Sequence, residues 1–261
     1  MTTEPLVLVA DAGATRTLTL NRPAAMNSFT TEMHGELLTA LNAAAGEEPV
    51  RCVVITGAGR GFCAGQDLGD PQAAPGKDLG ALIEAHYLPL VERIRSMPVP
   101  VIAAVNGVAA GAGANLAFCC DVVIAARAAS FIQAFSKIGL VPDTGGTFFL
   151  PRAIGLPMAT ALMMLGDKIT AQRAAELGLI YRVVPAASLD AEAMDLARSL
   201  AAMPTKALAF AKRALNGSLM NNLQQQLETE EEMQREAGRT HDFEEGVKAF
   251  REKRAAVFRG E

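Results

Sequence analysis

The order of apolar and polar positions predicts strands and helices in alternation over the first half of the chain. Two short apolar runs, residues 6–9 and 17–20, flank an Asp-Ala-Gly turn and predict a pair of strands. Beyond them, apolar residues recur four positions apart, at Phe29, Met33, Leu37 and Leu41. This spacing places them on one face of a helix.

Three apolar runs of five residues, 52–56, 101–105 and 121–125, show no alternation. Strands of this kind are covered on both faces, as in a parallel sheet between helices. A second helix is predicted between the first two runs, from the spacing of Leu79, Ile83, His86, Leu90 and Ile94. Strands that alternate with helices predict an α/β layered fold.

The strands stop at about residue 185, and the rest of the chain is predicted to be helical. We expect helices over residues 188–203, 205–216, 220–238 and 242–254. In the last of these, Asp242 and Glu245 are expected to form a capping pair. Because apolar helix faces are normally buried, we expect these helices to pack on the core or on a neighbouring subunit.

Composition and charge narrow the class of protein. The chain has 261 residues and is 50% hydrophobic, which is enough for a sizeable core. Its net charge of −4 argues against a nucleic-acid-binding protein, which usually carries a basic face. No apolar run reaches the ~20 residues of a membrane span, and the N-terminus does not resemble a signal peptide. We therefore expect a cytoplasmic protein without nucleic-acid or membrane partners.

The four cysteines do not indicate a metal site. Cys52 and Cys63 stand apart, and Cys119 and Cys120 are adjacent, so no pair has C-x-x-C spacing. Buried, reduced thiols are the expected state of such residues in a cytosolic protein. No metal ligand is predicted.

Three loops are rich in small residues, at residues 59–68, 106–115 and 139–147, and each of the first two follows a predicted strand. A dinucleotide-binding G-x-G-x-x-G motif is disfavoured, because its sixth position is Ala64 in the first loop and Leu116 in the second. Two interpretations of these two loops stay open. The small residues serve tight packing, or each loop supplies one backbone N–H to an oxyanion hole.

Asp143 is the ionisable residue of the third loop. It follows Pro142 and precedes a predicted helix, so one interpretation is a helix N-cap. The other interpretation is a general acid/base. The local sequence fits both.

Together, these loops resemble the enoyl-CoA hydratase/isomerase (crotonase) superfamily. The resemblance is carried by residues 61–68, 104–113 and 140–147. Asn21-Arg22-Pro23 with Asn27 is similar to the N-terminal motif of the superfamily, and residues 166–174 are similar to a further motif. The five motifs occur in order over essentially the whole chain.

The resemblance implies a fold and a class of substrate. The implied fold is a spiral of ββα units over residues 1–200, followed by a helical trimerisation region over residues 201–261. The implied assembly is a homotrimer or a hexamer built as a dimer of trimers. The implied substrates are acyl-CoA thioesters that react through an enolate, so coenzyme A is part of the substrate and no separate cofactor is expected.

The resemblance also implies site residues. By position, Ala64 and Ala112 would donate the two oxyanion-hole N–H groups, each stabilising the developing charge by roughly 3–4 kcal/mol. Other residues expected to contact the CoA ester lie just after the Asn21-Arg22-Pro23 motif and in the first loop. They are Ala24, Ala25, Met26, Gly65, Gln66, Asp67 and Leu68.

The chain departs from the hydratase pattern at two positions. Hydratases of the superfamily use two glutamates to activate a water molecule, and the matching positions here hold Asn115 and Phe135. Asp143 matches the single carboxylate of some isomerase branches, and an apolar wall at Phe135 would raise its pKa. Asn115 is expected to line the pocket or to cap a helix.

Residues 62–68, 112–117, 134–143 and 242–247 resemble an isomerase branch that acts on the ring epoxide of phenylacetyl-CoA in phenylacetate catabolism. Members of this branch can also shift double bonds in enoyl-CoA. We therefore expect an acyl-CoA isomerase with Asp143 as its acid/base. Two alternatives stay open: an enoyl-CoA hydratase and a non-catalytic acyl-CoA-binding subunit.

Overall fold

The computed structural model describes residues 4–46 and 49–261. Within them, six strands form the larger sheet, in the order β1-β2-β3-β5-β7-β10. Neighbouring strands are parallel except for the antiparallel hairpin of β1 and β2, so the predicted hairpin is confirmed. The strands are β1 (Val7–Ala12), β2 (Thr15–Leu20), β3 (Cys52–Gly57), β5 (Val101–Val105), β7 (Val122–Ala126) and β10 (Arg182–Val184).

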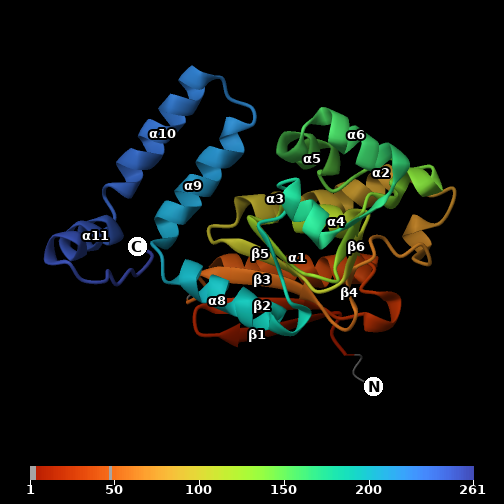
Figure 1. Ribbon diagram of the computed structural model, residues 1–261, viewed down its shortest axis with the longest axis horizontal. Helices are drawn as coiled ribbons and strands as arrows, with labels where there is room; N and C mark the ends of the chain where they lie inside the picture. The colour runs from red at the N-terminus through yellow and green to blue at the C-terminus, as the bar shows by residue number, and fades with distance from the viewer. Residues whose placement is uncertain (1–3, 47–48) are drawn as a thin grey trace.

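A second sheet of four short strands has the order β4-β6-β8-β9. Its strands are β4 (Gly61–Cys63), β6 (Val108–Ala110), β8 (Ser130–Ile132) and β9 (Lys168–Thr170). Each of β3, β5 and β7 leads into a strand of this sheet, and helices follow (Figure 1). This repeat confirms the expected spiral of ββα units. The sequence indicated only loops at β4 and β6, because three residues are too few to show a strand period.

Helices enclose the two sheets. α8 packs across β2, β3, β5 and β7, while α1 contacts β1 and β2. The helices as far as residue 201 are α1 (Thr31–Gly46), α2 (Leu79–Leu82), α3 (Leu88–Ser96), α4 (Ala112–Cys119), α5 (Gly146–Ile154), α6 (Leu156–Leu165), α7 (Ala171–Glu176) and α8 (Leu189–Ala201). A π-helical turn, η3 (Ile83–Tyr87), joins α2 to α3, so the predicted helix of residues 79–94 is confirmed with a local change of pitch.

Short 3-10 turns lie between these elements: η1 (Pro23–Ala25), η2 (Pro71–Ala73), η4 (Ala134–Ile138) and η5 (Ala186–Ser188).

The core is built from the strands predicted to be covered on both faces. Ile55 and Ile102 are fully buried, and side chains of this size contribute roughly 1.5–3 kcal/mol each on burial. Phe29 is fully buried as well, but it lies before α1 and not inside it.

Three helices extend away from the sheets and form an arm (Figure 1). They are α9 (Thr205–Ser218), α10 (Leu223–Ala237) and α11 (His241–Glu252), close to the predicted ranges. The predicted capping pair of α11 is wrong, because the Thr240 side chain accepts from the Phe243 N–H at 3.1 Å. The Asp242 carboxylate instead accepts from the N–H groups of Arg259 and Gly260, both at 2.7 Å, and so fixes the C-terminal segment.

The arm exposes large apolar side chains. They are Leu215, Met220, Leu223, Leu227, Phe243 and Phe250. Polar contacts attach its base to the core. The Arg51 guanidinium donates to the Met203 carbonyl at 2.6 Å and to the Thr205 hydroxyl at 2.7 Å, and Lys212 donates to Asp121 at 2.7 Å.

None of the described helices is both long and apolar enough to cross a membrane. The expectation that the chain lacks a signal peptide rests in part on residues 1–3, which lie outside the described residues.

Candidate active site

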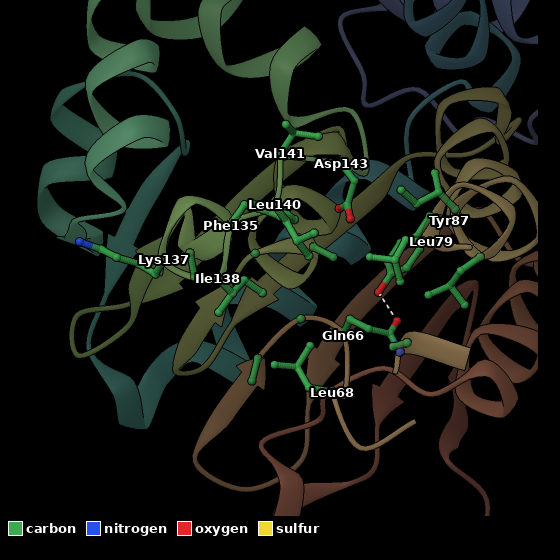
Figure 2. Close-up of a pocket in the computed structure, with 18 of the residues that line it drawn as sticks. Gln66, Leu68, Leu79, Tyr87, Phe135, Lys137, Ile138, Leu140, Val141 and Asp143 are labelled. Carbon is green, nitrogen blue, oxygen red and sulfur yellow. Dashed lines mark hydrogen bonds between the residues drawn. The ribbon is translucent and has the colours of Figure 1, made fainter. Parts of the chain in front are cut away.

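A cavity of about 470 Å³ opens among the three loops singled out in the sequence, η2, and the turn between α2 and α3 (Figure 2). Most of its wall is apolar. The larger apolar side chains are Leu68, Leu79, Leu82, Ile83, Phe135, Ile138, Leu140 and Val141. Polar side chains come from Gln66, Tyr87, Lys137 and Asp143, and the Lys137 amine points away from the cavity in Figure 2. A mostly apolar cavity with a few converging polar groups is typical of a small-molecule site.

The first two loops meet at the floor of this cavity. Their second halves follow β4 and β6, which are neighbouring parallel strands, so both leave the same edge of the sheet. A side chain on Gly65 would start 2.9 Å from the Ala110 carbonyl oxygen and 3.5 Å from the Ala112 nitrogen. Only glycine fits this approach, and its φ of +92° is unfavourable for other residues. The small residues therefore serve close contact between the loops.

Two backbone N–H groups on this floor have no acceptor among the described residues. One belongs to Ala112, the first residue of α4, where helix N–H groups lack intrahelical partners. The other belongs to Gln66, whose neighbours are held by Phe29: the Phe29 N–H donates to the Gly65 carbonyl at 2.7 Å, and the Asp67 N–H donates to the Phe29 carbonyl at 2.8 Å.

Ala64 differs from what we expected. Its N–H donates to the Met26 carbonyl at 3.0 Å, so it is not free to bind a ligand oxygen. The cause is non-local: Met26 and Asn27 both have positive φ, and they bring this carbonyl back to the end of β4. The buried Asn27 amide holds that turn by donating to the carbonyls of Ala58 at 2.9 Å and Gly61 at 2.8 Å. The free donor in this loop is thus Gln66 and not Ala64.

The other residues expected to contact a CoA ester divide into two groups. Gly65, Gln66 and Leu68 line the cavity together with Ala64 and Ala112. Four do not line it: Ala24, Ala25, Met26 and Asp67. The first three form η1 and its C-terminal cap beside β4. The Asp67 carboxylate accepts from Arg22 at 2.8 Å, and this bond holds the Asp67 pKa below its ordinary value.

Asp143 points its carboxylate into the cavity (Figure 2). Burial raises its pKa from 3.8 to about 6, although a hydrogen bond from the Thr144 hydroxyl at 2.7 Å opposes the rise. The interpretation as a helix N-cap is wrong, because α5 is preceded by Gly145 and receives no side-chain cap. A carboxylate with a pKa near neutrality can both accept and return a proton.

Thr144 is a site residue that the sequence analysis did not single out. It is buried and has a φ of +51°, and Gly145 follows with a φ of +75°. Two consecutive left-handed residues turn the chain sharply between Asp143 and α5. This turn places the Thr144 hydroxyl against the carboxylate; the Gly-Gly pair after Thr144 was the available signal.

Asn115 lies away from the cavity, contrary to both expectations for it. It is fully buried inside α4, whose N-cap is Gly111. Its amide donates to the Asp143 carbonyl at 2.8 Å and accepts from the Gln133 amide at 2.8 Å. Asn115 therefore fixes the backbone that carries Asp143. Asp143 lies 28 residues after Asn115, so the sequence around Asn115 gave no signal for this contact.

Phe135 does line the cavity, and its ring lies beside Gly111. Its position on η4 makes that wall apolar, as expected. Of the residues lining the cavity, all of them described, Asp143 is the only carboxylate. The floor therefore combines two unpaired N–H donors with one carboxylate. This set can hold an oxygen that becomes negative while a proton moves nearby.

The thiol nearest the floor is Cys63, which is fully buried. Burial raises its pKa to about 12, so it stays protonated and is unsuited to nucleophilic attack. Among the described residues, no group of three or more His, Cys, Asp and Glu side chains is arranged to hold a metal ion.

The comparison with protein families decides how this site is classified. The model of the enoyl-CoA hydratase/isomerase family matches residues 12–261. The chain belongs to this family.

Relatives within the family carry both activities in their names. The chain is 51% identical over 247 residues to the 1,2-epoxyphenylacetyl-CoA isomerase of Escherichia coli K12, covering 94% of each chain. It is 48% identical over 243 residues to a Rhodobacter capsulatus protein named "Probable enoyl-CoA hydratase", covering 93% of each. Among solved structures, an enoyl-CoA hydratase from Bacillus anthracis has a TM-score of 0.91 at 34% identity and covers 98% of this chain and 100% of that chain. The spiral fold and acyl-CoA hydratase/isomerase activity are thereby shown at the level of the family.

Proposed function

We propose that this protein is an acyl-CoA isomerase in which Asp143 moves the proton. The observation that carries the proposal is the single carboxylate of the cavity, with a pKa of about 6, set in a mostly apolar wall. A proton shift between two carbons needs one group that takes and returns a proton. Addition of water needs further groups that hold and activate the water. The two glutamate positions of hydratases are occupied by Asn115 and Phe135.

The proposed reaction begins when the thioester carbonyl oxygen binds the N–H groups of Gln66 and Ala112. The Asp143 carboxylate then accepts a proton from the α-carbon, which is adjacent to the thioester carbonyl. The electron pair moves to the carbonyl oxygen, where both donors stabilise the enolate charge. Protonated Asp143 returns the same proton to another carbon of the conjugated system. Atoms and charge balance, and no cofactor is needed besides the coenzyme A carried by the substrate.

Two substrates fit this scheme. One is 1,2-epoxyphenylacetyl-CoA, and the similarity to the isomerase of Escherichia coli supports it. Its conversion to the oxepin isomer in phenylacetate catabolism would combine the proton shift with opening of the carbon–carbon bond between the two epoxide carbons, whose electrons become part of the new double bonds. The other is a 3-enoyl-CoA, whose double bond would move into conjugation. Apolar side chains such as Leu82, Ile83 and Leu140 suit either hydrocarbon portion.

We also propose a division of the chain into a core of residues 1–200 and a helical region of residues 201–261 that builds a homotrimer or a dimer of trimers. The exposed apolar side chains of the arm support it, because such faces are normally covered. Light scattering coupled to gel filtration would test the assembly.

The test of function offers a 3-enoyl-CoA and 1,2-epoxyphenylacetyl-CoA to the wild type and to Asp143→Asn, with ultraviolet and mass-spectrometric detection. We expect a product of unchanged mass from the wild type and almost none from the variant. A gain of one water molecule would identify an enoyl-CoA hydratase instead. Binding of CoA esters without turnover, unaltered in Asp143→Ala, would identify a non-catalytic acyl-CoA-binding subunit.

A further inference from the structure

The side chain of Gln66 makes a contact that the proposed reaction does not use. The Tyr87 hydroxyl donates to the Gln66 side-chain oxygen at 2.7 Å, across the wall of the cavity (Figure 2). Tyr87 lies in the π-helical turn η3, and it is 2% exposed. π-helical turns are uncommon and often occur at functional sites. This contact links η3 to the loop that carries the free N–H group of Gln66.

The backbone on both sides of Gln66 is already held. Phe29 bonds to Gly65 and to Asp67, and the Asp67 carboxylate is paired with Arg22. The Gly65 carbonyl and the Gln66 N–H belong to one planar peptide group, so the bond from Phe29 sets the plane of that group. A single hydrogen bond still lets the group tilt about it, and the bond of the Gln66 side chain is a second restraint on that tilt. A further contact, from the Gln66 amide nitrogen to the Asp67 carbonyl, is long at 3.4 Å, and the Gln66 side chain also interacts with His34, which packs on Tyr87.

Tyr87 is in turn immobilised by aromatic neighbours. Its ring meets the His34 ring edge-on at 4.2 Å between centroids, and His34 stacks on Phe29 at 4.5 Å. Phe29 is the residue whose backbone bonds to Gly65 and Asp67. One buried aromatic cluster thus supports both the backbone and the side chain of the loop.

The hydroxyl of Tyr87 is a permanent donor. Burial and the negative charge of Asp143 both raise the pKa of Tyr87 well above its ordinary value. The hydroxyl therefore keeps its proton over the working range of pH, and its hydrogen bond to Gln66 persists.

We propose that Tyr87 is a positioning residue that acts through the Gln66 side chain to hold the Gln66 N–H in line with the thioester oxygen. The inference rests on the proposed function, because it names what orients one of the two donors. Donors that are fixed in advance stabilise a developing oxyanion better than donors that must reorient. The bond should therefore matter for the chemical step more than for binding of the CoA ester.

A double-mutant cycle tests this proposal, using Tyr87→Phe, Gln66→Met and the combined variant. We expect Tyr87→Phe to lower kcat roughly tenfold with KM changed less than about twofold, since only the transition state uses the aligned donor fully. Gln66→Met should give a similar loss, and the combined variant should lose no more than the larger single loss. Losses that multiply, or a rise in KM at constant kcat, would overturn the proposal.

The chain offers a matched control. Tyr181 is the other tyrosine, and its side chain is exposed outside the cavity. Tyr181→Phe removes the same atom and should leave kcat and KM unchanged. Thermal unfolding of each variant separates a positioning effect from partial unfolding, because a folded Tyr87→Phe with reduced kcat is required.

A second measurement does not need turnover. Infrared spectra of bound phenylacetyl-CoA, labelled with carbon-13 at the thioester carbonyl, report hydrogen bonding to that oxygen. We expect binding to the wild type to lower the carbonyl frequency and Tyr87→Phe to reverse part of that shift. An identical frequency in both would overturn the positioning role. If the wild type isomerises no substrate, the proposed function fails, while the spectra still decide the role of Tyr87.

Discussion

Two partly buried aspartates lie in regions with opposite surroundings. At the joint between the core and the arm, Asp121 accepts from the Lys212 ammonium at 2.7 Å and the Val101 N–H at 2.8 Å, with Arg95 at 3.4 Å. In the cavity, the side chain that donates to the Asp143 carboxylate is Thr144, and no described cation pairs with it.

The difference shows what a protein does with the cost of burying a carboxylate. At Asp121 the cost is offset by cations and an N–H, and the carboxylate joins three parts of the chain. At Asp143 the cost is left largely uncompensated, and it appears as a pKa of about 6. Such a group can change its protonation during a reaction, whereas a paired carboxylate holds structure in place.

Asp143→Asn should have the largest effect on activity. We expect kcat to fall by at least about a thousandfold, because the amide cannot accept the proton. The same substitution should raise the stability of the folded protein. Because the pKa of Asp143 is raised by folding, the wild type loses stability as pH rises from 3.8 towards 6, where the unfolded chain releases this proton more readily. Above that range the variant should therefore be more stable than the wild type, by at most about 3 kcal/mol.

Kinetics at saturating substrate and urea unfolding at pH 8 measure these two effects. Retention of kcat within tenfold would mean that Asp143 does not move the proton. A loss of stability in Asp143→Asn would mean that its surroundings are not the uncompensated site described above.

Lys212→Met should have the largest effect on stability. The change leaves Asp121 buried with a weaker set of partners, and breaking such a pair costs about 3 kcal/mol. Removing the charge as well, in Lys212→Met with Asp121→Asn, should recover part of that loss. Urea unfolding of the three proteins measures it, and kcat per folded molecule should stay within about twofold. A loss below about 0.5 kcal/mol would show that Arg95 and the Val101 N–H satisfy Asp121 without Lys212.

The two regions also differ in how far the sequence predicted them. Periodicity identified the strands β3, β5 and β7 and the helices of the arm, because each shows its pattern within a few residues. The resemblance to the crotonase superfamily, and not periodicity, assigned Asp143 and Ala112 to one site. The joint around Asp121 was not predicted, because Lys212 follows it by 91 residues and a charged residue on a helix shows no preference for a distant partner.

Within the site, the errors concern contacts that are not local. Ala64 was expected to donate to a ligand, but its N–H is used by Met26, 38 positions earlier in the chain. Asn115 was expected in the cavity wall, but its amide supports the Asp143 backbone. A motif indicates that a loop carries donors; which N–H group stays free depends on how the rest of the chain satisfies its neighbours.

Phe135→Gln should give Asp143 more polar surroundings, as Asp121 has, by making the wall of the cavity polar. With Asp143 acting as a base, kcat/KM of the wild type should rise with pH and reach half its maximum near pH 6. The polar wall reduces the desolvation of the carboxylate, so the midpoint should fall by about one pH unit. Phe135→Leu keeps the wall apolar and serves as the control. Equal midpoints for the two variants would show that this wall does not set the pKa.

Thr144→Ala should have the smallest effect. Like Asp121, Asp143 accepts a hydrogen bond that stabilises its charged form, and this variant removes that bond. The Thr144 hydroxyl stabilises the charged carboxylate and lowers its pKa, so its loss should raise the midpoint of kcat/KM above pH 6, by less than about one unit. Thr144→Ser retains the hydroxyl and should keep the midpoint of the wild type. A downward shift in Thr144→Ala would mean that water replaces the hydroxyl and solvates Asp143 better, and the cavity would then be wetter than its apolar lining indicates.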